Sequence, residues 1–276
     1  MANSEQPILL EKRGQIGYIT FNRPEKLNAI RPHDYILFDD LVNECERDDN
    51  VRAIIVTGKG RAWSAGDDIE AWYGPRQESY MEGDPGIALI LKSKYLELEL
   101  SGWKVPMHKT CLTLLNSGKV SIAAVNGICF IPEYLYAMDF AIAADVATFA
   151  QGDVRAGLCP GGASTQLAPR VLGRRRATEL ILLCEEISAQ EAYRVGLVNK
   201  VVPLAQLMPE AEALAKKLMA YPLSAIKLTK MAMTKAQDLP LNEGLDIEQW
   251  YMELSTQGEF KNFAQKFLAE KKAKGR

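Results

Sequence analysis

The stretch Val51-Arg52-Ala53-Ile54-Ile55-Val56-Thr57-Gly58-Lys59-Gly60 decides the fold of this chain. Its apolar run is short, rich in β-branched residues and closed by two glycines, which is typical of a buried strand. A helix is expected before it, because apolar side chains recur at helical spacing from position 32 to about position 47. A strand that alternates with helices in this way indicates βαβ units and parallel pairing.

Further strands are expected on both sides of this stretch. They cover residues 8–10, 16–20, 120–125, 140–144 and 197–202, and Gly14-Gln15 forms the turn between the first two. A helix is expected from Glu133 to Met138, and the chain beyond Arg174 is mostly helical in pattern. We therefore expect an α/β core over residues 1–200 and a helical region over 201–276 that serves as a cap or a subunit interface.

Charge and composition exclude several classes of protein. The 276 residues carry 33 Lys and Arg against 35 Asp and Glu, for a net charge of −2. This balance argues against nucleic-acid binding by bulk charge, because phosphate contacts need a basic surface. Residues 1–7 do not resemble a secretory signal, and no apolar stretch approaches the ~20 residues of a membrane span. We expect a soluble protein that acts without nucleic acid or membrane.

The cysteines and histidines predict neither disulfides nor a metal site. The five cysteines are widely spaced and form no CxxC pair, and the chain has only two histidines. Reduced thiols in a cytoplasmic protein are the expected state. The usual catalytic signatures are also missing: there is no GxSxG elbow, HExxH helix, Walker loop or GxGxxG fingerprint.

What remains is a set of glycine-bearing turns after strands, with acidic residues close to them. These segments are residues 63–69, 126–133 and 149–166. A helix that starts at Asp68 would present N–H groups able to bind a developing negative charge. By composition alone, however, Asp68 better fits the N-cap of an ordinary helix, Glu133 fits the first turn of another, and Asp153 fits a loop carboxylate without a chemical role.

Read in order, these segments resemble the crotonase family, the enoyl-CoA hydratases and isomerases. Asn22-Arg23-Pro24-Glu25-Lys26-Leu27-Asn28-Ala29 is similar to the family's coenzyme A loop. Ser64-Ala65-Gly66-Asp67-Asp68-Ile69 resembles the first oxyanion segment, and Ala124-Val125-Asn126-Gly127 opens the second. The runs at 149–166 and 192–198 also match the family pattern, so the resemblance covers nearly the whole chain.

The resemblance implies a crotonase-like core of repeated ββα units that assembles as a trimer or a pair of trimers. It implies an acyl-CoA substrate with no separate cofactor. The thioester oxygen would be held by the backbone N–H groups of Asp67 and Phe130, and such donors are commonly worth about 3–4 kcal/mol each. The substrate would lie along Lys26, Leu27, Ala65, Gly66, Asp68 and Ile69.

By the same resemblance, Glu133 and Asp153 are the two catalytic acids. In hydratases of the family such carboxyls share one water: one removes its proton and the other protonates the substrate α-carbon. Family isomerases can work with one carboxylate, so two acids favour a hydratase. A ring- or thioester-cleaving hydrolase and a non-catalytic protein that binds coenzyme A or RNA are the alternatives.

The sequence departs from the family pattern in three places. The usual triple glycine before the first acid is replaced by Cys129-Phe130-Ile131-Pro132, which is about two residues shorter. The second acid is Asp153 where Glu is commoner, which withdraws the carboxyl by roughly 1.5 Å. Residues 72–104 are rich in aromatics that either line a pocket for a cyclic acyl group or pack the core or an interface; these are Trp72, Tyr73, Tyr80, Tyr95 and Trp103.

Overall fold

The computed structural model describes residues 6–73, 106–257 and 259–273. Its centre is a six-stranded sheet in the order β1-β2-β3-β5-β7-β10, in which β1 is antiparallel to β2 and the other neighbours are parallel. The strands are β1 (Ile8–Arg13), β2 (Ile16–Phe21), β3 (Ala53–Gly58), β5 (Val120–Val125), β7 (Phe140–Ala144) and β10 (Lys200–Val202).

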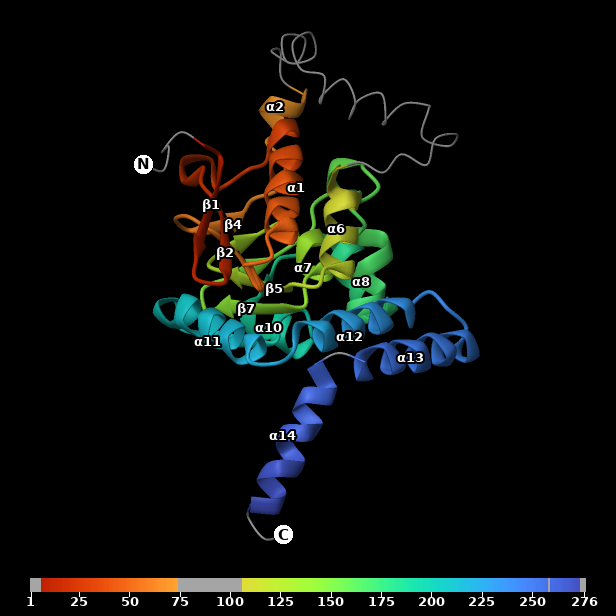
Figure 1. Cartoon of the computed structure of the whole chain (residues 1–276). Helices are drawn as coiled ribbons and strands as arrows, with labels where there is room; N and C mark the ends of the chain where they lie inside the picture. Colours follow the sequence, from red (N-terminus) through yellow and green to blue (C-terminus); the bar gives the residue numbers. More distant parts are fainter. Residues whose placement is uncertain (1–5, 74–105, 258, 274–276) are drawn as a thin grey trace.

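Helices cover both faces of this sheet, so its strands are apolar on both sides. Ile54 and Val56 point into one core, and Ala53 and Ile55 into the other, as expected for a strand with a two-residue period. On the first side lie α1 (Pro32–Arg47), α6 (Pro106–Asn116) and α7 (Glu133–Ala137); α11 (Leu207–Met219) covers the second (Figure 1).

A second, smaller sheet runs beside the first and consists of very short strands. Its order is β4 (Ala62–Ser64), β6 (Ile128–Cys129), β8 (Thr148–Phe149) and β9 (Ile187–Ser188). Tight turns link the sheets: a Cβ added at Gly127 would lie 2.1 Å from the Arg61 carbonyl oxygen, so only glycine fits there. The strands of both sheets and the helices after them form the repeated ββα pattern.

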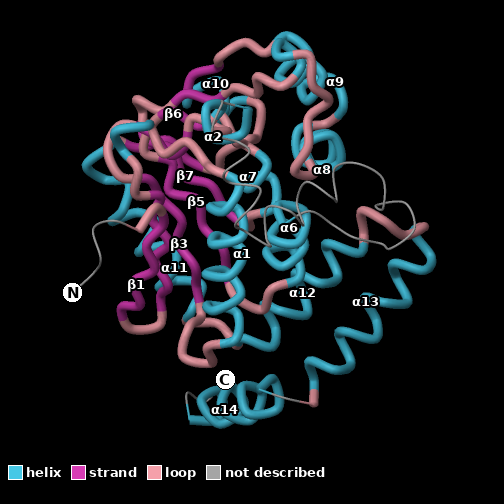
Figure 2. Tube along the Cα trace, turned by 90° about the horizontal axis from the view of Figure 1, so that it is seen from above, coloured by secondary structure: helices cyan, strands magenta, loops and turns pink. Residues whose placement is uncertain are grey.

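The rest of the chain is mostly helical. Its helices are η1 (Pro24–Lys26), α2 (Ile69–Tyr73), η2 (Val154–Ala156), α8 (Ser164–Leu172), α9 (Arg174–Thr178), η3 (Glu179–Leu183), α10 (Ala189–Arg194), η4 (Leu204–Gln206), α12 (Leu223–Lys235), α13 (Leu241–Thr256) and α14 (Glu259–Ala273). α12 is tied to the core by Lys230, whose Nζ lies 2.7 Å from Asp139 Oδ2. α13 runs beside α12, whereas α14 extends away from the strands (Figures 1 and 2).

The predicted fold class is confirmed, including the parallel sheet and the C-terminal helical region. The strand expected at 197–202 covers only its last three residues, and it pairs with β7 inside the main sheet. The division of the chain at residue 200 stays a prediction. Tyr80, Tyr95 and Trp103 lie outside the described residues, as do the side chains of Trp72 and Tyr73. Among the helices described, none combines the length and apolarity that crossing a membrane requires.

Candidate functional site

The loop after β2 is clamped to the segment that follows β4 by backbone hydrogen bonds. The Ala65 N–H donates to the Leu27 carbonyl at 2.9 Å, and the Ile30 N–H donates to the Gly66 carbonyl at 2.8 Å. The Asp68 N–H donates a hydrogen bond to the Ile30 carbonyl at 2.9 Å. Two segments of the predicted coenzyme A site, far apart in sequence, are thereby held side by side.

Side chains reinforce this clamp. Buried Asn28, in the left-handed region at φ 57°, donates to the carbonyls of Lys59 and Ala62 at 3.0 and 2.7 Å. Arg23 Nη2 lies 2.9 Å from Asp68 Oδ2, and both side chains are largely buried. Burial acts to raise the pKa of Asp68, but the hydrogen bond from Arg23 and other favourable contacts outweigh it and lower that pKa below its ordinary value.

The structure therefore brings together the predicted substrate-binding residues Leu27, Ala65, Gly66 and Asp68. The other two predicted substrate-binding residues, Lys26 and Ile69, lie at the surface. Ile69 is 63% exposed, which is unusual for a large apolar side chain, and Lys26 lies 3.6 Å from Glu70 in an exposed ion pair. An apolar side chain and a cation at the rim suit a ligand with an apolar arm and phosphates.

Asp67, the first predicted oxyanion donor, follows a glycine in a conformation that few other residues adopt. Gly66 has φ 94°, and Asp67 forms a parallel bridge with Ile30. Because the neighbours Gly66 and Asp68 make the bridge bonds, the Asp67 N–H is directed to the side away from Ile30. The Asp67 carboxylate accepts a 2.6 Å hydrogen bond from the Tyr35 hydroxyl.

Phe130, the second predicted donor, lies beside the first segment. A Cβ added at Gly66 would lie 3.4 Å from the Phe130 carbonyl oxygen, so the two backbones are neighbours. The Phe130 N–H, however, donates to the Ser64 carbonyl at 2.9 Å. A contact from this N–H to a thioester oxygen would require the bond to Ser64 to open or to be shared.

Glu133, the first predicted acid, is the first residue of α7 and is only 6% exposed. Burial raises its pKa to about 8, and the charges of Asp153 and Asp67 add to the effect. Its Oε1 accepts a 3.0 Å hydrogen bond from Gln151 Nε2. Its Oε2 is buried without a hydrogen-bond partner among the described residues.

Asp153, the second predicted acid, is half-buried just before η2. The charge of Asp153 contributes to the raised pKa of Glu133. Two further polar residues beside Glu133, Gln151 and Ser164, were given no role from the sequence. Both are completely buried, and burial of a glutamine and a serine is the signal that identifies them, which only the fold reveals.

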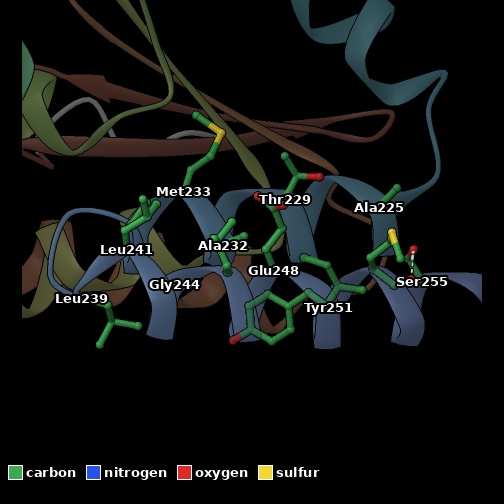
Figure 3. Close-up of a pocket in the computed structure, with 14 residues that line it drawn as sticks. Ala225, Thr229, Ala232, Met233, Leu239, Leu241, Gly244, Glu248, Tyr251 and Ser255 are labelled. Atoms are coloured by element: carbon green, nitrogen blue, oxygen red, sulfur yellow. Dashed lines mark hydrogen bonds between the residues drawn. The ribbon is translucent and has the colours of Figure 1, made fainter.

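A metal is not supported by the described part of the chain, which holds no cluster of His, Cys, Asp and Glu suited to one. A cavity of about 440 Å³ does open between α12 and α13, as Figure 3 shows. Apolar side chains such as Met233 and Leu241 dominate its wall, and none of the predicted site residues lines it. The cavity is therefore separate from the acids.

Comparisons with known proteins show which family the chain resembles. A family model described as enoyl-CoA hydratase/isomerase matches residues 11–274. A probable enoyl-CoA hydratase of Rhizobium meliloti is 32% identical over 273 residues, which is 98% of each chain. A 1,2-epoxyphenylacetyl-CoA isomerase of Escherichia coli is 30% identical over 92% of each chain. A solved enoyl-CoA hydratase from Bacillus anthracis superposes with a TM-score of 0.82 at 27% identity, over 96% of this chain and 97% of that one.

Proposed function

The chain belongs to the enoyl-CoA hydratase/isomerase family, and we propose that it adds water to an unsaturated acyl-CoA, or removes it. The observation that carries this proposal is the environment of Glu133. A carboxyl that is buried, has a pKa of about 8 and feels the charge of a second carboxyl has the properties of a general acid. Carboxyls whose pKa is raised by burial and by a neighbouring acid are found preferentially at active sites.

Hydration needs an acid and a base at the same double bond, and the two carboxyls supply them. Glu133 is mostly protonated at pH 7 because its pKa is about 8. As the water oxygen bonds to the β-carbon, its proton passes to Asp153, and the Glu133 proton passes to the α-carbon. The electrons of the double bond form an enolate on the way, and dehydration is the reverse.

The thioester oxygen carries the negative charge of that enolate. We infer that the Asp67 N–H is one donor to it, a contact of the kind worth about 3–4 kcal/mol. The Phe130 N–H becomes the second donor only if its bond to the Ser64 carbonyl opens or is shared. The coenzyme A portion would follow the clamp between Leu27 and Ala65 to the surface at Lys26 and Ile69. The substrate brings its own coenzyme A, so no separate cofactor is part of the proposal.

An isomerase is the second candidate. The acids differ in burial, since Glu133 is enclosed and Asp153 half-exposed, and one enclosed carboxyl suffices to move a proton between two carbons. The E. coli relative is named for 1,2-epoxyphenylacetyl-CoA, a thioester whose acyl group contains a ring. We keep a cyclic acyl group as the proposed substrate class.

Mass spectrometry of the products separates these reactions. The purified protein is incubated with matched linear and cyclic enoyl-CoA thioesters. A gain of one water supports the hydratase, and unchanged mass with altered chromatographic retention supports the isomerase. Free coenzyme A indicates a hydrolase, and binding without turnover indicates a protein that has kept the fold but lost the activity. Equal turnover of linear and cyclic thioesters would contradict the cyclic preference.

We also propose that the helical region assembles the chain into trimers or pairs of trimers in the cytoplasm. Large apolar side chains are exposed along α13 and α14, among them Trp250, Phe263 and Phe267, each more than half exposed. The cavity between α12 and α13 adds to this apolar surface (Figure 3). Light scattering on the purified protein should give three or six times the 30.6 kDa chain mass; a monomer would contradict the assembly.

A further inference from the structure

Glu133, Gln151 and Ser164 form a buried polar cluster. Glu133 is 6% exposed, and Gln151 and Ser164 are both 0% exposed. They come from the start of α7, the segment after β8 and the first residue of α8. Buried polar side chains that meet from three elements are costly unless they satisfy one another, so their hydrogen bonds define what the cluster does.

The amide of Gln151 uses its nitrogen for two contacts. Gln151 Nε2 donates to Glu133 Oε1 at 3.0 Å and to Ser164 Oγ at 2.5 Å. An amide nitrogen has two hydrogens, so both are committed. The Ser164 hydroxyl, having accepted from Gln151, can donate its own hydrogen. Burial raises the pKa of Glu133, whereas its own backbone N–H and the Ser164 hydroxyl act to lower that pKa.

The two oxygens of Glu133 are consequently unequal. Oε1 is held by Gln151, whereas Oε2 is buried with no hydrogen-bond partner among the residues described. The start of α8 is packed directly on this side chain: a Cβ added at Gly162 would lie 2.9 Å from Glu133 Cγ. Gly162 and Ala163 have φ of 58° and 73°, which turns the chain so that Ser164 enters the cluster.

We propose that Gln151 is a positioning residue that fixes Glu133 through Oε1, and that Ser164 holds Gln151 in place, which leaves Oε2 as the atom that exchanges a proton with the substrate carbon. This inference rests on the proposed function for its chemical consequence. The hydrogen-bonded arrangement itself can be tested without turnover.

Other groups also act on the Glu133 carboxyl, so the test must separate them from the cluster. Those that interact with it electrostatically in the described residues are Tyr35 on α1, Asp67 before α2, Cys111 on α6, Cys129 on β6, Tyr134 and Tyr136 on α7, and Asp153 before η2. The Ser164→Ala substitution leaves each of these side chains in the sequence.

Ser164→Ala is the test variant, and Thr165→Ala is its matched control. Both remove one hydroxyl from the same turn of α8, but Thr165 is exposed and Ser164 is buried beside Glu133. The pKa of Glu133 is measured by ¹³C NMR on protein labelled at the glutamate carboxyl carbon, with Glu133→Gln to assign the signal. We expect Ser164→Ala to raise the pKa and Thr165→Ala to leave it unchanged.

In the active protein, Ser164→Ala should lower kcat about 10-fold with KM within about twofold, because a misplaced acid affects the transition state more than binding. The positioning role is overturned if Ser164→Ala leaves the pKa of Glu133 where the control leaves it. If Ser164→Ala shifts the pKa of Glu133 but the wild-type protein turns over no enoyl-CoA, the positioning of Glu133 is supported and the proposed reaction is contradicted. Thus the two failures are distinguishable.

Discussion

Arg23 and Asp68 are 45 positions apart in the sequence, yet Arg23 Nη2 lies 2.9 Å from Asp68 Oδ2. This ion pair closes the clamp between the loop after β2 and the segment after β4, where the coenzyme A portion of the substrate is proposed to lie. Both side chains are largely buried, at 16% and 11% exposure, so the contact is less screened by solvent than a surface pair.

Asp68→Asn should weaken substrate binding more than chemistry. Asn keeps the capping contact to the Ala71 N–H but loses the charge that pairs with Arg23. We expect KM for an acyl-CoA to rise about 10-fold and kcat to stay within about twofold, as for loss of uniform binding. The control is Glu191→Gln, which alters an exposed pair with Arg194. An unchanged KM in Asp68→Asn would show that the clamp does not shape the site.

The amide NMR signals of Asp67 and Phe130 report which backbone N–H groups contact the thioester oxygen. If its bond to the Ser64 carbonyl persists in the complex, a non-reactive acyl-CoA analogue should shift the amide NMR signal of Asp67 and leave that of Phe130 nearly unchanged. Large shifts of both signals would mean that the bond to Ser64 opens on binding. A shift confined to Phe130 would contradict the assignment of Asp67 as the first donor.

Lys230→Met should destabilise the protein by about 3 kcal/mol, because it leaves the largely buried Asp139 without its cation. Lys230 Nζ also donates to the Lys119 carbonyl at 2.6 Å, so the change removes both of these polar contacts between α12 and the core. Arg170→Met breaks a pair with Asp238 at 3.4 Å that is well exposed, and should cost under about 0.5 kcal/mol. Urea denaturation measures both; equal small losses would contradict the anchoring role.

Glu133 should make the stability of the protein depend on pH. Its folded-state pKa, about 8, is above the ordinary value of 4.5, so the folded protein binds a proton more tightly than the unfolded chain. The stabilisation that this gives is complete below pH 4.5 and is lost as pH rises to 8.

Glu133→Gln removes this dependence. At pH 9 the variant should be more stable than the wild type by about 5 kcal/mol, with the gain shrinking toward zero near pH 4.5. Thermal or urea unfolding across this range provides the measurement. A gain that does not change with pH would mean that the carboxyl titrates near its ordinary value.

The sequence alone predicts much of the main sheet, because its strands are long apolar runs bounded by turns. β5 and β7 and α1 have the expected limits. The second sheet could not be predicted in this way, since strands of two or three residues such as β6 are too short to show a period.

At the site, the sequence pattern identifies which acids to consider but not how they are held. Glu133 and Asp153 follow from the family resemblance. The hydrogen bond from Phe130 to Ser64 depends on the register of β4 against β6, which no local pattern encodes. Gln151 and Ser164 resemble ordinary loop residues until the fold buries them against Glu133.

The central claim is that Glu133 and Asp153 together carry the addition of water. Its most direct test is the hydration rate of an enoyl-CoA with Glu133→Gln and Asp153→Asn, beside the exposed controls Glu179→Gln and Asp145→Asn. We predict that each site variant loses at least about 100-fold in kcat, as removal of a general acid or base typically does, and that the controls keep wild-type rates. Wild-type hydration in either site variant would contradict the two-acid account.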